Sequence, residues 1–106
     1  MKDLALAYYY NMNRNWYTYI ITNHKNTVLY IGITNSLERR VYEHKNKINT
    51  SSFSNKYNLY KLAWFQMFKT PNEAIEAEKK IKGWKRDKKI DLIKKDNPDF
   101  RDLIKN

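Results

Sequence analysis

The stretch that decides the fold spans residues 16–44 and reads WYTYIITNHKNTVLYIGITNSLERRVYEH. Two β-branched and aromatic runs, residues 16–22 and 28–33, flank a polar five-residue loop at 23–27. In the first run alternate residues point to opposite faces, and both faces carry enough apolar side chains to be at least partly covered. The two runs therefore predict an antiparallel β-hairpin.

The second half of this stretch changes to helical spacing and predicts a helix that runs to about Asn46. Asn35 is the predicted N-cap, and the side chain of Glu38, three residues later, can reach back to it. Arg40 and His44 stand four residues apart on neighbouring turns, so both side chains can reach the same point beyond the sheet. We therefore expect the hairpin and this helix to line the same side of a functional site.

Gly32 interrupts the second predicted strand, two residues after Tyr30. Glycine has no side chain to pack and weakens a strand interior. Within a strand it therefore usually marks a bulge or a place where another group approaches the backbone closely. We expect one of these two features at Gly32.

Residues 60–68, YKLAWFQMF, form the most apolar run of the chain and predict the central strand of the sheet. Thr70, Pro71 and Glu73 follow as the N-cap and the first and third residues of a second helix. This helix is expected to end near Lys82. The chain therefore passes from the third strand into a helix after a very short turn.

The second predicted helix would bury a stripe formed by Ala74, Ala77 and Ile81, and Glu78 falls on that same stripe. A carboxylate on an apolar face needs a reason. One alternative is that Glu78 turns outward and pairs with Lys82, four residues on, a common surface arrangement worth about 0.3–0.5 kcal/mol.

Two further segments complete the outline. Residues 47–58 have no helical or strand period and predict a polar loop, whereas residues 84–95 predict a third helix. Phe100 and Leu103, in the tail that follows, are expected to pack back on the domain. The element order is β-β-α-β-α-α, which is typical of the α+β class.

A length of 106 residues fits one small domain with one modest core. We expect a single domain at residues 16–103, an N-terminal extension at 1–15 and a tail at 104–106. Met12, just ahead of the first strand, is an alternative start of the functional part.

Cysteine is absent, which excludes disulfide scaffolds, thiolate metal sites and cysteine nucleophiles. No apolar run approaches the roughly 20 residues of a membrane span, and the N-terminus lacks the hydrophobic core of a signal peptide. We therefore expect a cytoplasmic protein that does not enter a membrane.

The charge balance is strongly positive, with 21 Lys and Arg against 11 Asp and Glu and a net charge of +10. Such a surplus favours a polyanionic partner, because bound phosphates release counterions when lysine and arginine neutralise them. Nucleic acid is the leading partner class. The alternative is a lysine-rich and asparagine-rich coding bias that has no functional meaning.

The tripeptides Tyr17-Thr18-Tyr19 and Tyr30-Ile31-Gly32 lie on the two hairpin strands, and Arg40 lies on the helix that follows. Their order and spacing resemble the GIY-YIG endonuclease superfamily. The second half of the signature is intact, whereas in the first half Tyr17 and Thr18 stand where the family has glycine and isoleucine. The eleven-residue spacing of the two tyrosines and the ten-residue step to Arg40 resemble the incision domain of the UvrC repair protein.

The resemblance extends to the small, single-domain, bacterial YhbQ-like branch and covers roughly residues 16–103. The additional matching segments are, in chain order, Leu37-Glu38-Arg39-Arg40 through His44, Lys56-Tyr57-Asn58, Glu78-Lys79, Lys82-Gly83-Trp84 and Asn97-Pro98. This ordered set implies a small three-stranded antiparallel sheet flanked by helices. For function it implies a metal-dependent DNA endonuclease in repair or recombination, acting on DNA that includes branched or structured forms. Specificity is expected to come from a protein partner or from the shape of the nucleic acid.

Phosphodiester hydrolysis needs an activated water and stabilisation of charge on the phosphoryl oxygens and the departing oxygen. By the resemblance, one divalent metal ion, Mg²⁺ or Mn²⁺, is held mainly by Glu78, whose oxygens suit such ions. Tyr19 or Tyr30 is the expected general base, and the sequence does not choose between them. Arg40 is expected to stabilise the phosphoryl group and His44 to orient a phosphate or share proton transfer.

We expect basic side chains in the polar loop and in the lysine-rich segment around and after Glu78 to contact the phosphates of nucleic acid. The candidates are Lys56, Lys79, Lys82, Lys85 and Arg86. Two competing functions stay open. The chain could be a nucleic-acid-binding module with little or no turnover, since its first motif is degenerate, or a membrane-surface protein that uses a cationic helix.

Overall fold

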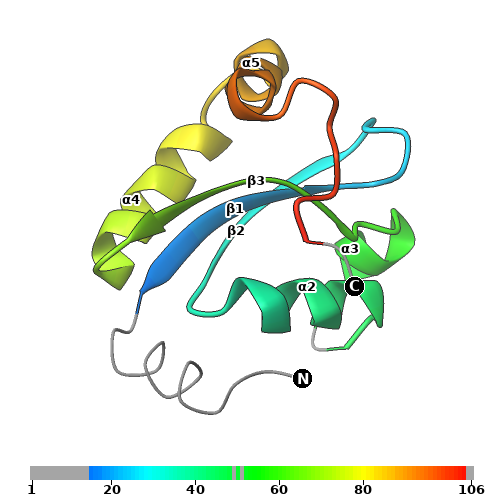
Figure 1. Ribbon diagram of the computed structural model, residues 1–106, viewed down its shortest axis with the longest axis horizontal. Helices are drawn as coiled ribbons and strands as arrows, with labels where there is room; N and C mark the ends of the chain where they lie inside the picture. The colour runs from blue at the N-terminus through cyan, green and yellow to red at the C-terminus, as the bar shows by residue number, and fades with distance from the viewer. Residues whose placement is uncertain (1–14, 49, 51, 105–106) are drawn as a thin grey trace.

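The computed structural model describes residues 15–48, 50 and 52–104 (Figure 1). The elements are, in chain order, β1 (Trp16–Thr22), β2 (Leu29–Thr34), α2 (Leu37–Lys45), α3 (Ser52–Lys56), β3 (Lys61–Phe68), α4 (Pro71–Lys82) and α5 (Arg86–Asp96). The α+β class and the predicted order are confirmed, with the short α3 as an addition. The predicted extension at 1–15 lies, except for Asn15, outside the described residues.

The three strands form one antiparallel sheet in the order β2-β1-β3. The predicted hairpin is confirmed, but the prediction that residues 60–68 form the central strand is wrong, because β1 lies between the other two. The first half of β3 is buried at Leu62 and Trp64, whereas Phe65 and Met67 in the second half are exposed. The apolar character of this run therefore reflects burial of its first half in the core, although β3 lies at the edge of the sheet.

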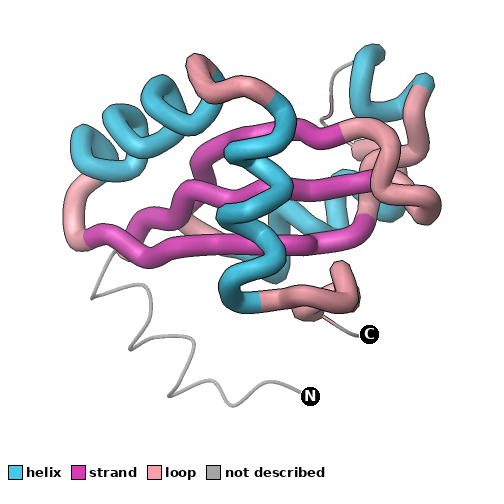
Figure 2. The backbone as a smooth tube through the Cα atoms, turned by 90° about the horizontal axis from the view of Figure 1, so that it is seen from above, coloured by secondary structure: helices cyan, strands magenta, loops and turns pink. Residues whose placement is uncertain are grey.

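Helices cover both faces of the sheet (Figures 1 and 2). On the α4 and α5 side the buried cluster comprises Ile20, Ile31, Ala63, Trp64, Ile81, Ile93 and Phe100. On the α2 side it comprises Tyr19, Ile21, Val41, Leu59 and Leu62. Neighbouring β1 residues therefore belong to different clusters, as the alternating pattern predicts. One consequence is that Tyr19 faces α2.

The start of α2 differs by one residue from the prediction. The Oγ of Ser36, and not the side chain of Asn35, accepts the capping hydrogen bond from the backbone N–H of Arg39 at 3.3 Å. The Oδ1 of Asn35 instead accepts from the Arg39 guanidinium at 3.0 Å. Both residue types favour the N-cap, so the local sequence could not decide between them.

The helix of residues 71–82 begins as predicted, because the backbone N–H of Glu73 donates to the Oγ1 of Thr70 at 3.3 Å. The last helix begins at Arg86, two residues after the predicted start, since Lys85 has an extended backbone. The predicted polar loop at 47–58 is wrong in part, because α3 lies within it. Burial of Ser54 and Leu59 holds that short helix against the domain.

The C-terminal residues return to β3. The N–H of Leu62 donates to the Oδ1 of Asp102 at 3.1 Å, and the N–H of Leu103 donates to the carbonyl of Leu62 at 2.8 Å. Phe100 is buried as predicted, but the side chain of Leu103 is exposed and that expectation is wrong. Ile104, assigned to the tail, packs partly against the α2-side cluster. Within the described part of the chain, no helix is long and apolar enough to cross a membrane.

Candidate active site

Tyr19 lies at the centre of the sheet, and its side chain is almost completely buried. It stands opposite Gly32 in the register of β1 and β2. A Cβ atom at position 32 would lie 2.5 Å from the Tyr19 hydroxyl oxygen and 2.7 Å from its Cζ. The close approach expected at Gly32 is therefore confirmed, and the group that approaches is the phenol of Tyr19.

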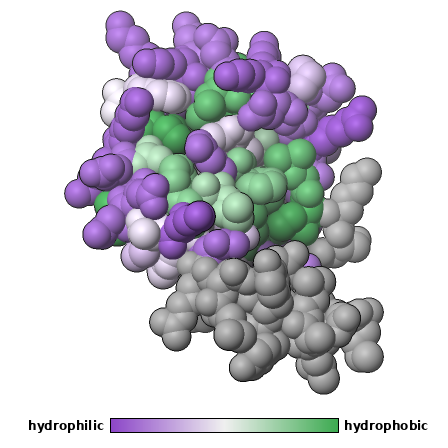
Figure 3. Space-filling view, turned by 60° about the vertical axis from the view of Figure 1, so that its left-hand side comes forward, coloured by the Kyte–Doolittle hydropathy of each residue, from purple (hydrophilic) through white to green (hydrophobic). Residues whose placement is uncertain are grey.

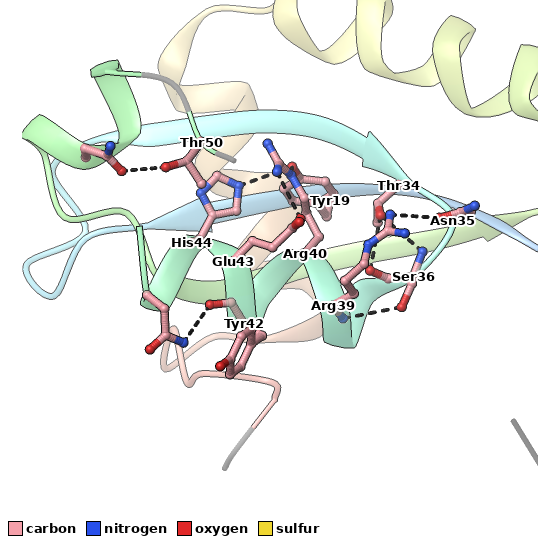
Figure 4. Close-up of polar contacts among 12 residues, drawn as sticks. Tyr19, Thr34, Asn35, Ser36, Arg39, Arg40, Tyr42, Glu43, His44 and Thr50 are labelled. Carbon is pink, nitrogen blue, oxygen red and sulfur yellow. Dashed lines mark hydrogen bonds and ion pairs between the residues drawn. The ribbon is translucent and has the colours of Figure 1, made fainter. Parts of the chain in front are cut away.

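The Tyr19 hydroxyl is the meeting point of two side chains from α2 (Figure 4). The Nε of Arg40 donates to it at 3.3 Å, and the Nε2 of His44 lies 3.5 Å from it. Tyr30 completes the group, with its ring centroid 5.7 Å from that of His44 and 6.4 Å from that of Tyr19. The structure thus brings together Tyr19, Tyr30, Arg40 and His44.

Arg40 and His44 make different kinds of contact with the Tyr19 hydroxyl. Because Arg40 can only donate, the Tyr19 oxygen accepts from its Nε. The contact between the hydroxyl and the Nε2 of His44 takes either direction according to the tautomer of the imidazole. The Nδ1 of His44 is a buried atom with no hydrogen-bond partner among the described residues, and buried polar atoms of this kind are frequent at functional sites.

The burial of these groups shifts their protonation equilibria. Burial raises the pKa of Tyr19 to about 12, against the lowering effect of the hydrogen bond from Arg40. Burial, aided by the positive charge of Arg40, lowers the pKa of His44 to about 4. Burial acts to lower the pKa of Arg40, but its contacts with Tyr19 and Glu43 raise it above the usual value. At neutral pH the site therefore holds a neutral phenol, a neutral imidazole and a guanidinium.

Glu43 is a member of the site that the sequence analysis missed. Its Oε1 accepts from the NH1 of Arg40 at 3.2 Å, and both side chains are largely buried. The three-residue spacing on one helix face was the available signal. Glu43 therefore helps to hold the guanidinium beside Tyr19.

Glu78 comes from α4, on the other side of the sheet. The Oγ1 of Thr18 donates to the carbonyl of Ala74 at 2.8 Å, which fixes the turn of α4 that precedes Glu78. The negative charge of Glu78 contributes to raising the pKa of Tyr19, so the carboxylate lies within electrostatic range of the phenol. Within the described residues it makes no hydrogen bond to Tyr19, and its partner is Lys82.

The predicted surface pair between Glu78 and Lys82 is present, with the Nζ of Lys82 3.3 Å from the Oε2 of Glu78. The two side chains differ in exposure, at 19% for Glu78 and 53% for Lys82. The carboxylate is thus mostly covered while the ammonium is in water. Glu78 therefore pairs with Lys82 and also lies within electrostatic range of Tyr19.

A family model described as the GIY-YIG catalytic domain matches residues 15–91, which include every residue of this cluster. The chain belongs to the GIY-YIG family. Membership places it in a nuclease family and agrees with the site, since the two signature tyrosines and Arg40 are the residues in contact. Thr18, which departs from the family signature, is the residue that bonds this GIY-YIG domain's β1 to α4.

Relatives of similar size support this assignment. A UPF0213 protein of Vibrio parahaemolyticus is 32% identical over 83 residues, covering 78% of this chain and 76% of the relative. A UPF0213 protein of Vibrio campbellii is 34% identical over 80 residues, covering 76% and 75%. The solution NMR structure of a UPF0213 protein from Bacillus halodurans has a TM-score of 0.52 at 23% identity, covering 83% of this chain and 92% of that one. The similarity to the Bacillus halodurans structure is a similarity of fold.

The donor set of the GIY-YIG domain can hold a divalent ion through one carboxylate. Among residues 15–48, 50 and 52–104, no three His, Cys, Asp or Glu side chains gather into a metal-binding group. An ion would therefore be held by Glu78 together with oxygens of water and phosphate, an arrangement that Mg²⁺ accepts. The fit is reasonable, because a cation can displace the exposed ammonium of Lys82 without moving a buried group.

The predicted nucleic-acid contacts occupy exposed positions on three helices and the turn between two of them. Figure 3 brings the α4 side forward and shows hydrophilic residues bordering an apolar area. Arg86 is partly committed to structure, because its NH2 donates to the carbonyl of Asn26 in the hairpin loop at 3.0 Å. Lys56 lies on α3, with its Nζ 5.4 Å from the ring centroid of Tyr57. Lys79 and Lys85 are exposed.

Proposed function

We propose that this protein is a divalent-metal-dependent endonuclease that hydrolyses phosphodiester bonds in DNA. The observation that carries the proposal is the convergence of Arg40 and His44 on the Tyr19 hydroxyl, beside Tyr30 and within range of the Glu78 charge. Membership of the GIY-YIG family and the net charge of +10 support the same conclusion. Branched or otherwise structured DNA and a role in repair or recombination are part of the proposal.

In this mechanism Arg40 binds the scissile phosphate. Its guanidinium carries a permanent charge, and its planar set of donors matches the geometry of phosphoryl oxygens. Charge that develops on those oxygens during attack is stabilised because Arg40 is already held in place. A divalent ion at Glu78, when bound, would supply Lewis acidity to the phosphate and to the attacking water.

Tyr30 is assigned as the group that accepts the proton of the attacking water. Tyr19 is nearly inaccessible, and burial raises its pKa to about 12, so it is poorly suited to that step and serves to position Arg40 and His44. Tyr30 is only partly buried and packs against neutral His44. Tyr30 would take the water proton as a phenolate, the form that a bound cation would favour. The oxygen–phosphorus bond to the water forms as the bond to the departing sugar oxygen breaks, and that oxygen takes a proton from the solvent.

The test is cleavage of supercoiled, single-stranded and branched DNA with Mg²⁺ or Mn²⁺ by the wild type and three variants. Glu78→Gln, Arg40→Met and Tyr30→Phe are each expected to lower the rate by about 100-fold or more. Tyr42→Phe changes an exposed tyrosine on α2 and should keep the wild-type rate. A wild type that is no more active than Glu78→Gln, while both bind DNA, would refute the enzyme assignment.

A second candidate function is a DNA-binding module with little turnover. It is favoured by the ion pair that occupies Glu78 and by the degenerate first motif at Tyr17 and Thr18. This alternative predicts metal-independent binding of equal strength by the wild type and Glu78→Gln, with no cleavage by either. The same assay therefore separates the two functions.

A further inference from the structure

The short helix α3 displays two aromatic rings on the surface, outside the candidate active site. Phe53 and Tyr57 stand four residues apart with ring centroids 4.9 Å apart and planes inclined by 55°. Phe53 is 46% exposed and Tyr57 is 37% exposed. The Nζ of Lys56 lies 5.4 Å from the centroid of the Tyr57 ring. Aromatic rings and a cation are thus presented together to the solvent.

Packing within the domain does not account for this pair. The residues of this segment that reach the core are Ser54 and Leu59, and Leu59 belongs to the same buried cluster as Tyr19. The N–H of Leu59 donates to the carbonyl of Ser54 at 3.1 Å, which fixes α3 to that cluster. Phe53 and Tyr57 lie on the side of α3 that is left outside.

The position of α3 relative to the site is also defined. The chain passes from the last turn of α2, which carries His44, to α3 through residues 46–51. Figures 1 and 4 show α3 at the end of α2 where His44 lies. α3 therefore lies next to the end of α2 that carries His44, beside the candidate active site.

We propose that Phe53 and Tyr57 form a stacking platform for an unpaired base of the substrate, with Lys56 neutralising an adjacent phosphate. This inference rests on the proposed nuclease function and narrows its substrate. Every base has a π-face that stacks on aromatic rings, but a base within a duplex has both faces occupied by its neighbours. The substrate class is therefore DNA with unpaired nucleotides next to the cleaved bond, such as a single strand, a flap or an open junction.

The decisive measurement is the binding of two fluorescent oligonucleotides of equal length and charge, one with all bases and one with a run of abasic sites. Full-length wild type is used in a chelating buffer, so that binding is measured without cleavage. Wild type should bind the intact strand about 10-fold more tightly than the abasic strand. The double variant Phe53→Ala/Tyr57→Ala should lose that preference, because only the phosphate contacts remain.

Matched variants separate stacking from folding and from charge. Phe53→Trp and Tyr57→Phe retain a ring and should keep the preference for the intact strand, whereas Tyr42→Ala removes an exposed tyrosine on α2 and should leave it unchanged. Lys56→Met should weaken both strands equally and reduce the salt dependence of binding. Thermal unfolding of each variant shows whether α3 has remained in place.

The outcomes distinguish this inference from the nuclease function. If wild type does not cleave but Phe53→Ala/Tyr57→Ala loses the preference for intact strands, the platform stands and the nuclease function fails. If wild type cleaves and the double variant still prefers intact over abasic strands as wild type does, the platform is refuted. Where Phe53→Ala/Tyr57→Ala is unfolded, Phe53→Leu/Tyr57→Leu keeps apolar side chains on α3 and takes its place in this comparison. A preference for intact strands that is lost in Lys56→Met but kept in the double variant also refutes it, since the charge and not the rings would then explain the contact.

Discussion

The hydroxyl of Tyr19 fills the space that a side chain at Gly32 would need. The distances from a Cβ at that position to the phenol are 2.5 Å to the oxygen, 2.7 Å to Cζ and 3.1 Å to Cε2. Because Tyr19 is buried and is bonded by Arg40, its ring has little freedom to move away. The absence of a side chain at Gly32 thus leaves room for the Tyr19 ring in its observed position.

Gly32→Ala is therefore expected to lower the free energy of unfolding by about 1–3 kcal/mol, because the ring must leave its place to accommodate the methyl group. Urea denaturation measures this loss. Gly83→Ala is the matched control, since a Cβ there would be 3.5 Å from its nearest atom, and the change should stay within about 1 kcal/mol. Adding Tyr19→Phe should recover part of the loss, and no recovery would mean that the hydroxyl is not the obstacle.

Thr18→Val is expected to weaken the attachment of α4 to the sheet. The hydroxyl that donates to the Ala74 carbonyl is lost while the shape of the side chain is kept, at a cost of about 1 kcal/mol. Cleavage activity should fall as well, since Glu78 follows Ala74 by one helical turn. Thr22→Val removes a buried hydroxyl that donates to the Oδ1 of Asn26 in the hairpin loop, and it should leave activity intact. Equal activity in both variants would contradict this role of Thr18.

His44 should make the fold sensitive to mild acid. Its pKa is about 4 in the fold and about 6.5 in an unfolded chain, so below pH 6.5 the unfolded state binds a proton that the folded state does not. This contribution is fully present above pH 6.5 and is lost as the pH falls toward 4, by on the order of 1–3 kcal/mol. The measurement is the difference in unfolding free energy between wild type and His44→Gln at several pH values. That difference should shrink with acid, and a constant difference would argue against a buried neutral imidazole. His24→Gln, in the exposed hairpin loop, serves as the control.

Lys82→Met is expected to strengthen the binding of Mn²⁺ to the protein. The ammonium that now pairs with the Oε2 of Glu78 competes with a metal ion for the same oxygen. Calorimetric titration with Mn²⁺ should therefore give a lower dissociation constant for Lys82→Met than for wild type. Lys80→Met removes an exposed lysine from the same helix and serves as the control for net charge. Unchanged affinity in Lys82→Met, or an equal gain in Lys80→Met, would place the ion elsewhere.

The sequence was informative wherever short spacings determine the geometry. Arg40 and His44 meet Tyr19 because a helical step of four residues brings both to one point, and that step is visible in the chain. The cap at Thr70 could be predicted for the same reason. Ser36 was missed because Asn35 next to it is an equally good cap, and only the exit of β2 decides between them.

Features that depend on distant partners could not be predicted. Whether β1 or β3 is central depends on pairings between residues 39 to 52 positions apart, and both runs are apolar. α3 exists because Leu59 and Ser54 are buried by the rest of the domain, which the polar composition of residues 47–58 conceals. The partnership of Glu43 with Arg40 follows a helical spacing, but many exposed pairs have that spacing as well.

The contacts of Asp102 and Leu103 with Leu62 have a practical consequence for handling the protein. β3 is an edge strand, and free backbone groups on an edge strand are a template for pairing with another chain. The C-terminal residues occupy that template at Leu62. A chain cut before Asp102 should therefore self-associate through its third strand as its concentration rises. An affinity tag at this end should be joined through a linker that leaves both contacts in place.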